Sequence, residues 1–255
     1  MQKQSLDYQI NGVGKDVVLL HGFLESPIIW EEFLQVADGD FRSINVHIPN
    51  HHSSNASLYF NDLTEQAEIL YHTLIEANVQ SPILIGHSLG GYLALAFIDK
   101  YPEFASGIAL VNSSCLADTG EQKTRRTRAI NLVETHPSAF INMAIKNLFQ
   151  EAHLKKHSIA IIKLIATANK LPIPAIQASL TAMRDRTDTS EALRKFDKKK
   201  LFIYGQYDPL IPLETSEKAI RNSNCPSTAL DAGHMSWLED KENLHEALLE
   251  FINKQ

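Results

Sequence analysis

The segment Pro82-Ile83-Leu84-Ile85-Gly86-His87-Ser88-Leu89-Gly90-Gly91-Tyr92 decides the fold of this chain. It begins as a short apolar run rich in β-branched residues, which is typical of a buried strand. Apolar residues then recur at helical spacing as far as Tyr101. Between the two lies Gly86-x-Ser88-x-Gly90, where the strand must turn at once into a helix. Such a turn holds its middle residue in a strained conformation, and the flanking glycines leave room for the two backbones to approach. We therefore predict that the Ser88 hydroxyl is raised above the edge of a sheet.

The composition fits one large α/β domain, or a core with an insertion. The chain has 255 residues, of which 44% are hydrophobic and 21% charged, and a formal net charge of -6. This charge argues against nucleic acid or an anionic membrane as the main partner. There is no apolar run of about 18 residues, and the first residues lack the apolar core of a signal peptide. Cys115 and Cys225 show no metal or redox spacing. We expect a cytoplasmic protein that needs no metal or cofactor.

Strands and helices are predicted to alternate along most of the chain. The expected strands cover residues 8–10, 17–20, 44–48, 82–86, 107–111, 201–205 and 227–230. The expected helices cover residues 63–77, 89–101 and 213–221, and a last helix carries Leu244, Leu248 and Phe251 on one face. Alternation at this spacing indicates right-handed βαβ crossovers and a mostly parallel sheet.

The alternation is interrupted between residues 115 and 186, where only helical patterns occur. The run Asp118-Thr119-Gly120-Glu121 resembles a capping box that opens the first of four helices, and Pro137 suits the first turn of the second. A third helix is expected over 152–170, and a fourth carries Ile176, Leu180 and Met183. We interpret residues 115–186 as a helical lid, inserted between core segments 1–114 and 187–255.

A serine nucleophile requires a base, and the base requires a third group that orients it. Asp208 follows one late strand and His234 follows the next, so that both are expected to converge on Ser88 at the carboxyl edge of the sheet. Asp231 and Asp118 are the alternative acids. The N–H groups of Phe23 and Leu89 are the expected oxyanion donors, because one follows an early strand and the other begins the helix after Ser88.

Four motifs together resemble the signatures of the α/β-hydrolase superfamily: His21-Gly22-Phe23, Gly86-His87-Ser88-Leu89-Gly90-Gly91, Tyr204-Gly205-Gln206-Tyr207-Asp208 and Gly233-His234. More narrowly, they resemble its lidded, single-domain bacterial esterases, carbon–carbon hydrolases and enol-lactonases. The resemblance implies Ser88 as nucleophile, Asp208 as acid and His234 as base. It makes His21, Gly22 and His87 candidates for substrate contact, although the turn should direct His87 to pack beneath it. One departure concerns the run His47-Ile48-Pro49-Asn50-His51-His52-Ser53-Ser54, which lacks the two glycines that relatives have there.

Two further groups of residues have a structural and a functional interpretation. His47, His51 and His52 suggest a metal site, but no carboxylate or cysteine joins them at ligand spacing, so we do not favour one. Arg125, Arg126 and Arg128 could hold a substrate carboxylate, as could Arg184 and Arg186. A solvated helix face is the favoured interpretation.

The resemblance implies a serine hydrolase that cleaves an ester or related acyl bond of a small molecule. The alternatives are a carbon–carbon hydrolase or enol-lactonase with the same three residues and, less favoured, a ligand-binding receptor on a hydrolase scaffold. The sequence does not specify the acyl and alcohol groups.

Overall fold

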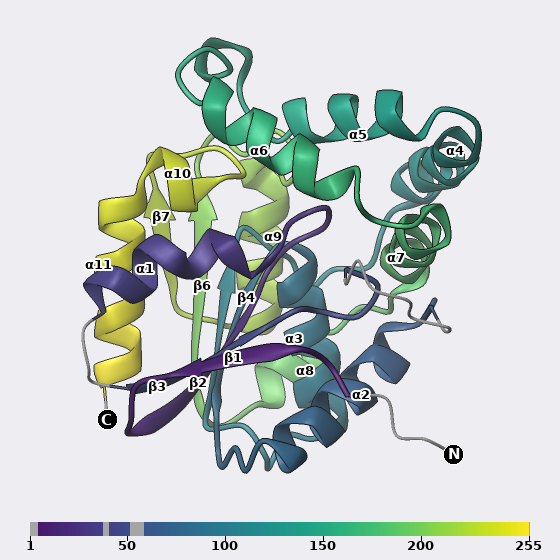
Figure 1. Ribbon diagram of the computed structural model, residues 1–255. Coiled ribbons are helices and arrows are strands. Elements are labelled where there is room, and N and C mark those ends of the chain that lie inside the picture. Colours follow the sequence, from purple (N-terminus) through teal and green to yellow (C-terminus); the bar gives the residue numbers. More distant parts are fainter. Residues whose placement is uncertain (1–4, 38–40, 52–58, 255) are drawn as a thin grey trace.

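The computed structural model describes residues 5–37, 41–51 and 59–254 and contains a seven-stranded sheet in the order β1-β3-β2-β4-β5-β6-β7 (Figure 1). Neighbouring strands are parallel except for β1, which pairs antiparallel with β3. The predicted mostly parallel sheet is thereby confirmed. The strands are β1 (Tyr8–Asn11), β2 (Lys15–Leu20), β3 (Phe41–Val46), β4 (Ile83–His87), β5 (Gly107–Val111), β6 (Lys199–Gly205) and β7 (Ser227–Leu230).

Each strand of the centre contributes to both faces of the sheet, because successive side chains alternate in direction. In β2, Val18 and Leu20 belong to one apolar cluster, whereas Val17 and Leu19 belong to the other. The first cluster packs against α2 (Leu63–Glu76), α3 (Leu89–Lys100), α8 (Ser190–Lys195) and α9 (Leu213–Ser223). The second packs against the 3₁₀ turn η1 (Pro27–Trp30), α1 (Glu31–Val36) and α11 (Lys241–Asn253). The sheet is thus covered on both sides, as its unbroken apolar strands require.

The parallel strands end at one edge of the sheet, where their loops meet. In register, Leu20 lies beside Gly86, His87 beside Val111, and Gly205 beside Leu230. This is the edge at which an open α/β sheet places its functional loops.

Helices alone fill the segment 115–186, which lies above this edge (Figure 1). They are α4 (Gly120–Thr135), α5 (Pro137–Lys146), the 3₁₀ turn η2 (Glu151–His153), α6 (Ser158–Ala168) and α7 (Ile173–Asp185). We call 115–186 the helical insertion. Within the described residues no single helix is long and apolar enough to cross a membrane, and α6 with α7 passes that test only as a pair bent by 106°.

Several local expectations need correction. The capping box of α4 begins one residue later than expected, at Thr119, whose side chain and N–H exchange hydrogen bonds with Gln122. Asp118 cannot cap, since its carboxylate binds Arg126 and Arg186. The helix expected over 152–170 is shorter and begins at Ser158. Sequence patterns also missed η1, α1, α8 and α10 (Ser236–Glu239), which are too short to show a clear period.

Candidate active site

Ser88 lies between β4 and α3 in a strained backbone conformation, with φ 50° and ψ -114°. The adjacent glycines are required by close packing. A Cβ atom on Gly86 would collide with the backbone of Gly90, and one on Gly90 would collide with the carbonyl oxygen of Leu20. The sharp turn predicted from Gly86-x-Ser88-x-Gly90 is therefore confirmed. It lifts the Ser88 side chain above the end of β4.

Ser88, His234 and Asp208 form a continuous chain of hydrogen bonds. The Nδ1 atom of His234 lies 2.7 Å from Oδ2 of Asp208, and its Nε2 atom lies 2.9 Å from Oγ of Ser88. Because a carboxylate only accepts, Nδ1 carries the proton of the neutral ring and Nε2 is left to accept the serine hydroxyl. This is the arrangement in which a histidine can remove the serine proton.

The Asp208 carboxylate is held in the ionised form that this arrangement needs. Its Oδ1 atom accepts the N–H groups of Leu210 at 2.8 Å and Ile211 at 2.9 Å. Burial raises the pKa of Asp208, but the electrostatic interaction and hydrogen bond with His234, together with these two N–H groups, lower the pKa overall.

Asn112, which sequence reasoning missed, also holds the Asp208 carboxylate in place. It follows β5 with φ 45°, and its amide Nδ2 donates to Asp208 Oδ2 at 3.2 Å and to the carbonyl of Gly233 at 2.9 Å. Its Oδ1 atom accepts from the hydroxyl of Ser236. An asparagine directly after a predicted buried strand was the available signal, because strand ends at this edge carry the functional side chains.

Phe23 and Leu89 present backbone N–H groups that no described acceptor receives. The N–H groups on either side of Phe23 are used, since Gly22 donates to Oε2 of Glu25 at 2.6 Å and Leu24 donates to Nε2 of His51 at 3.2 Å. Phe23 also lines the cavity that contains Ser88. These properties are those expected of oxyanion donors.

His21, Gly22 and His87 do not line this cavity, and their interpretation as substrate contacts needs correction. The rings of His21 and His87 are completely buried. The Nδ1 atom of His21 lies 2.9 Å from the carbonyl of Gly22, and its Nε2 atom accepts from the N–H of Ile48 at 3.3 Å. The Gly22 N–H is occupied by Glu25. All three therefore pack beneath the cavity and support the residues that line it, as the sequence suggested for His87 alone.

His87 forms a buried ion pair with Glu25, a residue that no motif singled out. Its Nδ1 atom lies 2.9 Å from Oε2 of Glu25, and its Nε2 atom lies 2.9 Å from the carbonyl oxygen of His234. Both facing oxygens accept, so both ring nitrogens must donate, which requires the imidazolium form. Burial lowers the pKa of His87, but the charge and hydrogen bond of Glu25 outweigh it and raise the pKa overall.

His51 and His21 are neutral side chains that tie two loops together. The Nδ1 atom of His51 lies 3.0 Å from the carbonyl of Pro49, while its Nε2 atom accepts from Leu24. Burial lowers the pKa of His51 to about 4 and that of His21 well below its usual value. No group of three metal-binding side chains gathers in the part of the chain that is described. His52 lies outside that part.

Neither of the two alternative acids has a described hydrogen bond to His234. Both carboxylate oxygens of Asp118 bind arginines, Oδ2 to Arg126 and Oδ1 to Arg186. Asp231 is exposed. Of the three candidates, Asp208 alone has a hydrogen bond to His234.

A cavity of about 840 Å³ joins Ser88 and His234 to the helical insertion. This is large enough for a small organic molecule. Its walls combine apolar side chains with polar and charged ones, among them Arg125 and Arg126 of α4. A shallower hollow of about 950 Å³ lies near Lys15 and Lys199 at the opposite ends of the strands, away from all of the predicted site residues.

Comparisons with known proteins bear on the family and the fold of this chain. The model of the family described as "alpha/beta hydrolase fold" matches residues 16–241. The pimeloyl-[acyl-carrier protein] methyl ester esterase of Vibrio cholerae is 22% identical over 98% of this chain and 99% of its own. A thermophilic esterase from Thermogutta terrifontis, solved with malate bound, has a TM-score of 0.87 and 26% identity over 97% of this chain and 92% of its own. The enol-lactonase from Burkholderia xenovorans LB400 has a TM-score of 0.88 and 14% identity over 98% and 96%.

The family match covers most of the chain, from the second residue of β2 through β7, and includes the helical insertion. It also spans Ser88, Asp208 and His234. The chain therefore belongs to the α/β-hydrolase fold family.

Proposed function

We propose that this protein is a serine hydrolase that cleaves the ester bond of a small molecule, with Ser88 as nucleophile, His234 as base and Asp208 as the orienting acid. The observation that carries the proposal is the chain of hydrogen bonds from Asp208 through His234 to Oγ of Ser88, at a cavity of about 840 Å³.

The reaction follows from the chemistry of these groups. Ser88 attacks the ester carbonyl while His234 takes its proton, and the charge of Asp208 stabilises the resulting imidazolium. The N–H groups of Phe23 and Leu89 hold the oxyanion. His234 then protonates the leaving alcohol. In the second half of the reaction His234 takes a proton from a water molecule, which attacks the acyl-enzyme, and returns that proton to Oγ of Ser88 as the acid leaves. Every step is assigned to side chains or N–H groups of the chain itself, so we propose no cofactor.

The names of similar proteins support ester chemistry. They include the esterases described above and a pyrrolizixenacetamide deacetylase from Xenorhabdus hominickii, 23% identical over 97% of this chain. The lactonase likeness is one of fold, and no contact among the described residues of the site favours carbon–carbon or lactone cleavage over ester cleavage. A receptor without turnover is the remaining alternative.

Two finer expectations belong to this proposal. The helical insertion acts as a lid that selects substrates, because it supplies much of the cavity wall while the three proposed catalytic residues lie outside it. A cytoplasmic location without a nucleic-acid or membrane partner is the second, and cell fractionation tests it.

A phosphonate ester probe tests the catalytic assignment. The probe should add irreversibly to one serine, because its tetrahedral adduct imitates the oxyanion intermediate. Peptide mass mapping should place the label on Ser88, and His234→Ala should slow the labelling sharply while the protein stays folded. A burst of phenolate from an activated aryl ester would add kinetic evidence for the acyl-enzyme. Labelling at another residue, or labelling that is indifferent to His234, would overturn the proposal.

A further inference from the structure

Asp118 lies between two arginines in the wall of the Ser88 cavity. Its Oδ2 atom is 2.5 Å from Nε of Arg126, and its Oδ1 atom is 2.5 Å from Nη1 of Arg186. The carboxylate is only 1% exposed. All three residues line the same cavity as Ser88. Two guanidinium groups thus share one carboxylate, and the cluster carries a net positive charge.

The two arginines differ in what their remaining N–H groups face. Arg186 is 8% exposed, donates to the carbonyl of Met183 at 2.6 Å, and lies 4.0 Å from the ring centroid of Tyr92. It is held from several sides, although its buried Nε atom has no described acceptor. Arg126 is 23% exposed, and beyond Asp118 its only described acceptor is the sulfur of Met183, 3.4 Å from Nη1. A thioether is a weak acceptor for a guanidinium group. Arg126 therefore retains donors that the described residues leave unsatisfied.

Other charged groups of the cavity do not balance this excess. Arg125 pairs with Glu121 on the exposed face of α4, and Glu25 pairs with His87. Lys218 and Asp188 contribute one charge of each sign. Asp118 is best understood as the clamp that fixes both guanidinium groups in place. The clamp leaves one positive charge facing a half-enclosed space, where charge is screened less than in water.

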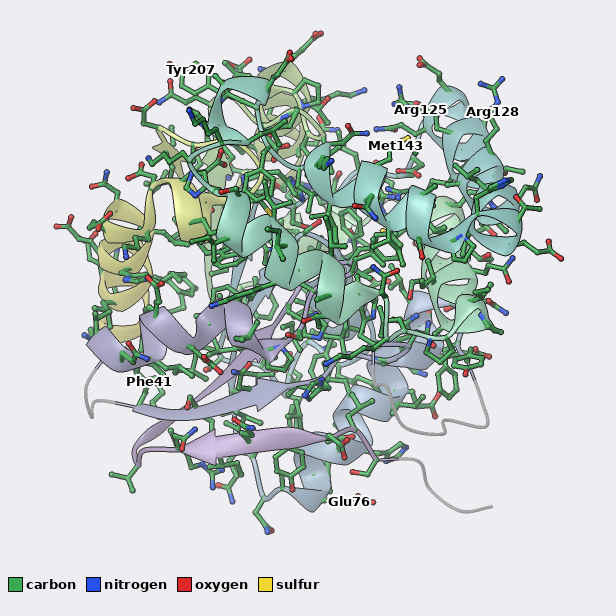
Figure 2. The ribbon with its side chains drawn as sticks, turned by 45° about the horizontal axis from the view of Figure 1, so that its top comes forward. Phe41, Glu76, Arg125, Arg128, Met143 and Tyr207 are labelled. Carbon is green, nitrogen blue, oxygen red and sulfur yellow. The ribbon has the colours of Figure 1, made fainter. Side chains whose placement is uncertain are left out.

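We propose that Arg126, held by Asp118 and supported by Arg186, binds a carboxylate carried by the substrate. A carboxylate is chosen because one negative charge restores the balance, and because its two oxygens match the planar fork of a guanidinium group. The inference rests on the proposed function, since it takes Ser88 as the reacting residue of the same cavity. It reverses the favoured sequence interpretation for Arg126, but not for Arg128, which projects outward from α4 (Figure 2). Arg125 borders the cavity but is paired with Glu121.

Matched pairs of esters test this subsite. The p-nitrophenyl monoester of glutaric acid is compared with the p-nitrophenyl ester of pentanoic acid, which has the same chain length without the carboxylate. Longer dicarboxylic monoesters vary the reach, and 3-carboxyphenyl acetate against phenyl acetate places the charge on the alcohol side. We expect kcat/KM to favour the charged member of at least one series by about tenfold or more, the range of a charge-assisted hydrogen bond.

Arg126→Gln should remove this preference and leave the neutral esters hydrolysed at nearly the original rate. Arg128→Gln, on the exposed face of the same helix, is the matched control and should keep the preference. If Arg126→Gln does not fold, Arg126→Lys replaces it, since it keeps the charge but loses the planar fork. Competitive inhibition by glutarate in the unmodified protein gives a second measurement.

Two outcomes would overturn the inference: equal kcat/KM within every pair, or a preference that survives in Arg126→Gln. Neither would affect the catalytic assignment, which depends on labelling of Ser88 and on hydrolysis of the neutral esters. Conversely, a protein that hydrolyses none of the esters but binds glutarate through Arg126 would leave the subsite intact and overturn the proposed function.

Discussion

Glu25 and His87 form a buried ion pair, 2.9 Å from Oε2 to Nδ1, directly behind the proposed catalytic histidine. The ring centroids of His87 and His234 are 5.2 Å apart, and Nε2 of His87 contacts the carbonyl of His234. Because Glu25 also accepts the N–H of Gly22, one path of hydrogen bonds joins the loop of Phe23 to the backbone of His234. The pair therefore positions both the proposed oxyanion donor and the proposed base.

Glu25→Gln should lower kcat by roughly tenfold and change KM by less than twofold. Without the negative charge of Glu25, His87 is neutral and has one N–H group for two facing oxygens, those of residue 25 and of the His234 carbonyl. One of these buried oxygens is then left without a donor, at a cost of about 1–3 kcal/mol. The rate of phosphonate labelling at Ser88 should fall in parallel. Steady-state kinetics on a neutral ester and the labelling rate are the measurements.

Asp16→Asn is the matched control for that variant. Asp16 is also a buried carboxylate that accepts one backbone N–H, from Gln80 at 2.7 Å, and pairs with a cation, Arg42. It lies at the opposite end of β2 from the site. Asp16→Asn should lower the melting temperature and leave kcat unchanged. If both variants lose stability and neither loses kcat, Glu25 has a structural role only.

Asp208→Asn should leave the fold intact and lower kcat by about 10⁴, the cost of the same exchange in serine proteases. The amide favours the tautomer of His234 that carries its proton on Nε2, so the Ser88 hydroxyl loses its acceptor. Asp231→Asn should have no effect, because Asp231 is exposed. Activity of the Asp208 variant within a few-fold of the parent protein would show that Asp208 is a turn residue only.

The turn around Ser88 and the sheet could be predicted because their signals are local. A strand that ends in Gly86-x-Ser88-x-Gly90 determines its own geometry, and the strained φ of 50° at Ser88 is its result. The strand ends that carry Asp208 and His234 could be ordered along the chain for the same reason. Because parallel strands end at one edge of the sheet, Asp208 and His234 could be expected to lie near Ser88.

The contacts behind the site could not be predicted in this way. Glu25 and His87 are 62 residues apart, and Asn112 and Asp208 are 96 apart. No period or spacing connects such pairs, because only the packed fold brings them together. The same reason explains why Asp118 was kept as an alternative acid. Its partner Arg186 is 68 residues away.

Gly90→Ala should lower the free energy of unfolding severely or prevent folding. The added Cβ would meet the carbonyl oxygens of Leu20 and His21, and backbone atoms of a central strand cannot move aside cheaply. Gly120→Ala is the control, because at this first residue of α4 a Cβ meets no atom within 4 Å. It should be neutral, or stabilising by up to about 1 kcal/mol. Urea unfolding of both proteins gives the comparison, and equal stability would contradict the close packing inferred at Gly90.

The neutral pair His51 and His21 should make the fold sensitive to acid. Both have a folded pKa below the unfolded value of 6.5, that of His51 at about 4, so the unfolded chain binds more protons below pH 6.5. Their contribution to stability is therefore fully present above pH 6.5 and is lost as the pH falls toward 4. His87 acts in the opposite sense, since its raised pKa gives stability that is present below pH 6.5 and lost as the pH rises through the folded pKa.

Comparing the parent protein with His51→Gln isolates the effect of His51, because the other titrating groups are common to both. The free energy of unfolding of the parent should fall more steeply between pH 6.5 and pH 4.5, by up to about 1.4 kcal/mol per pH unit. The glutamine variant should be less stable at pH 7.5, where its amide replaces the hydrogen bonds to Leu24 and Pro49 imperfectly. The two stabilities should then converge as the pH falls. Parallel curves over this range would mean that His51 takes up its proton as readily in the folded protein as in the unfolded chain, and that its Nε2 atom does not accept from Leu24.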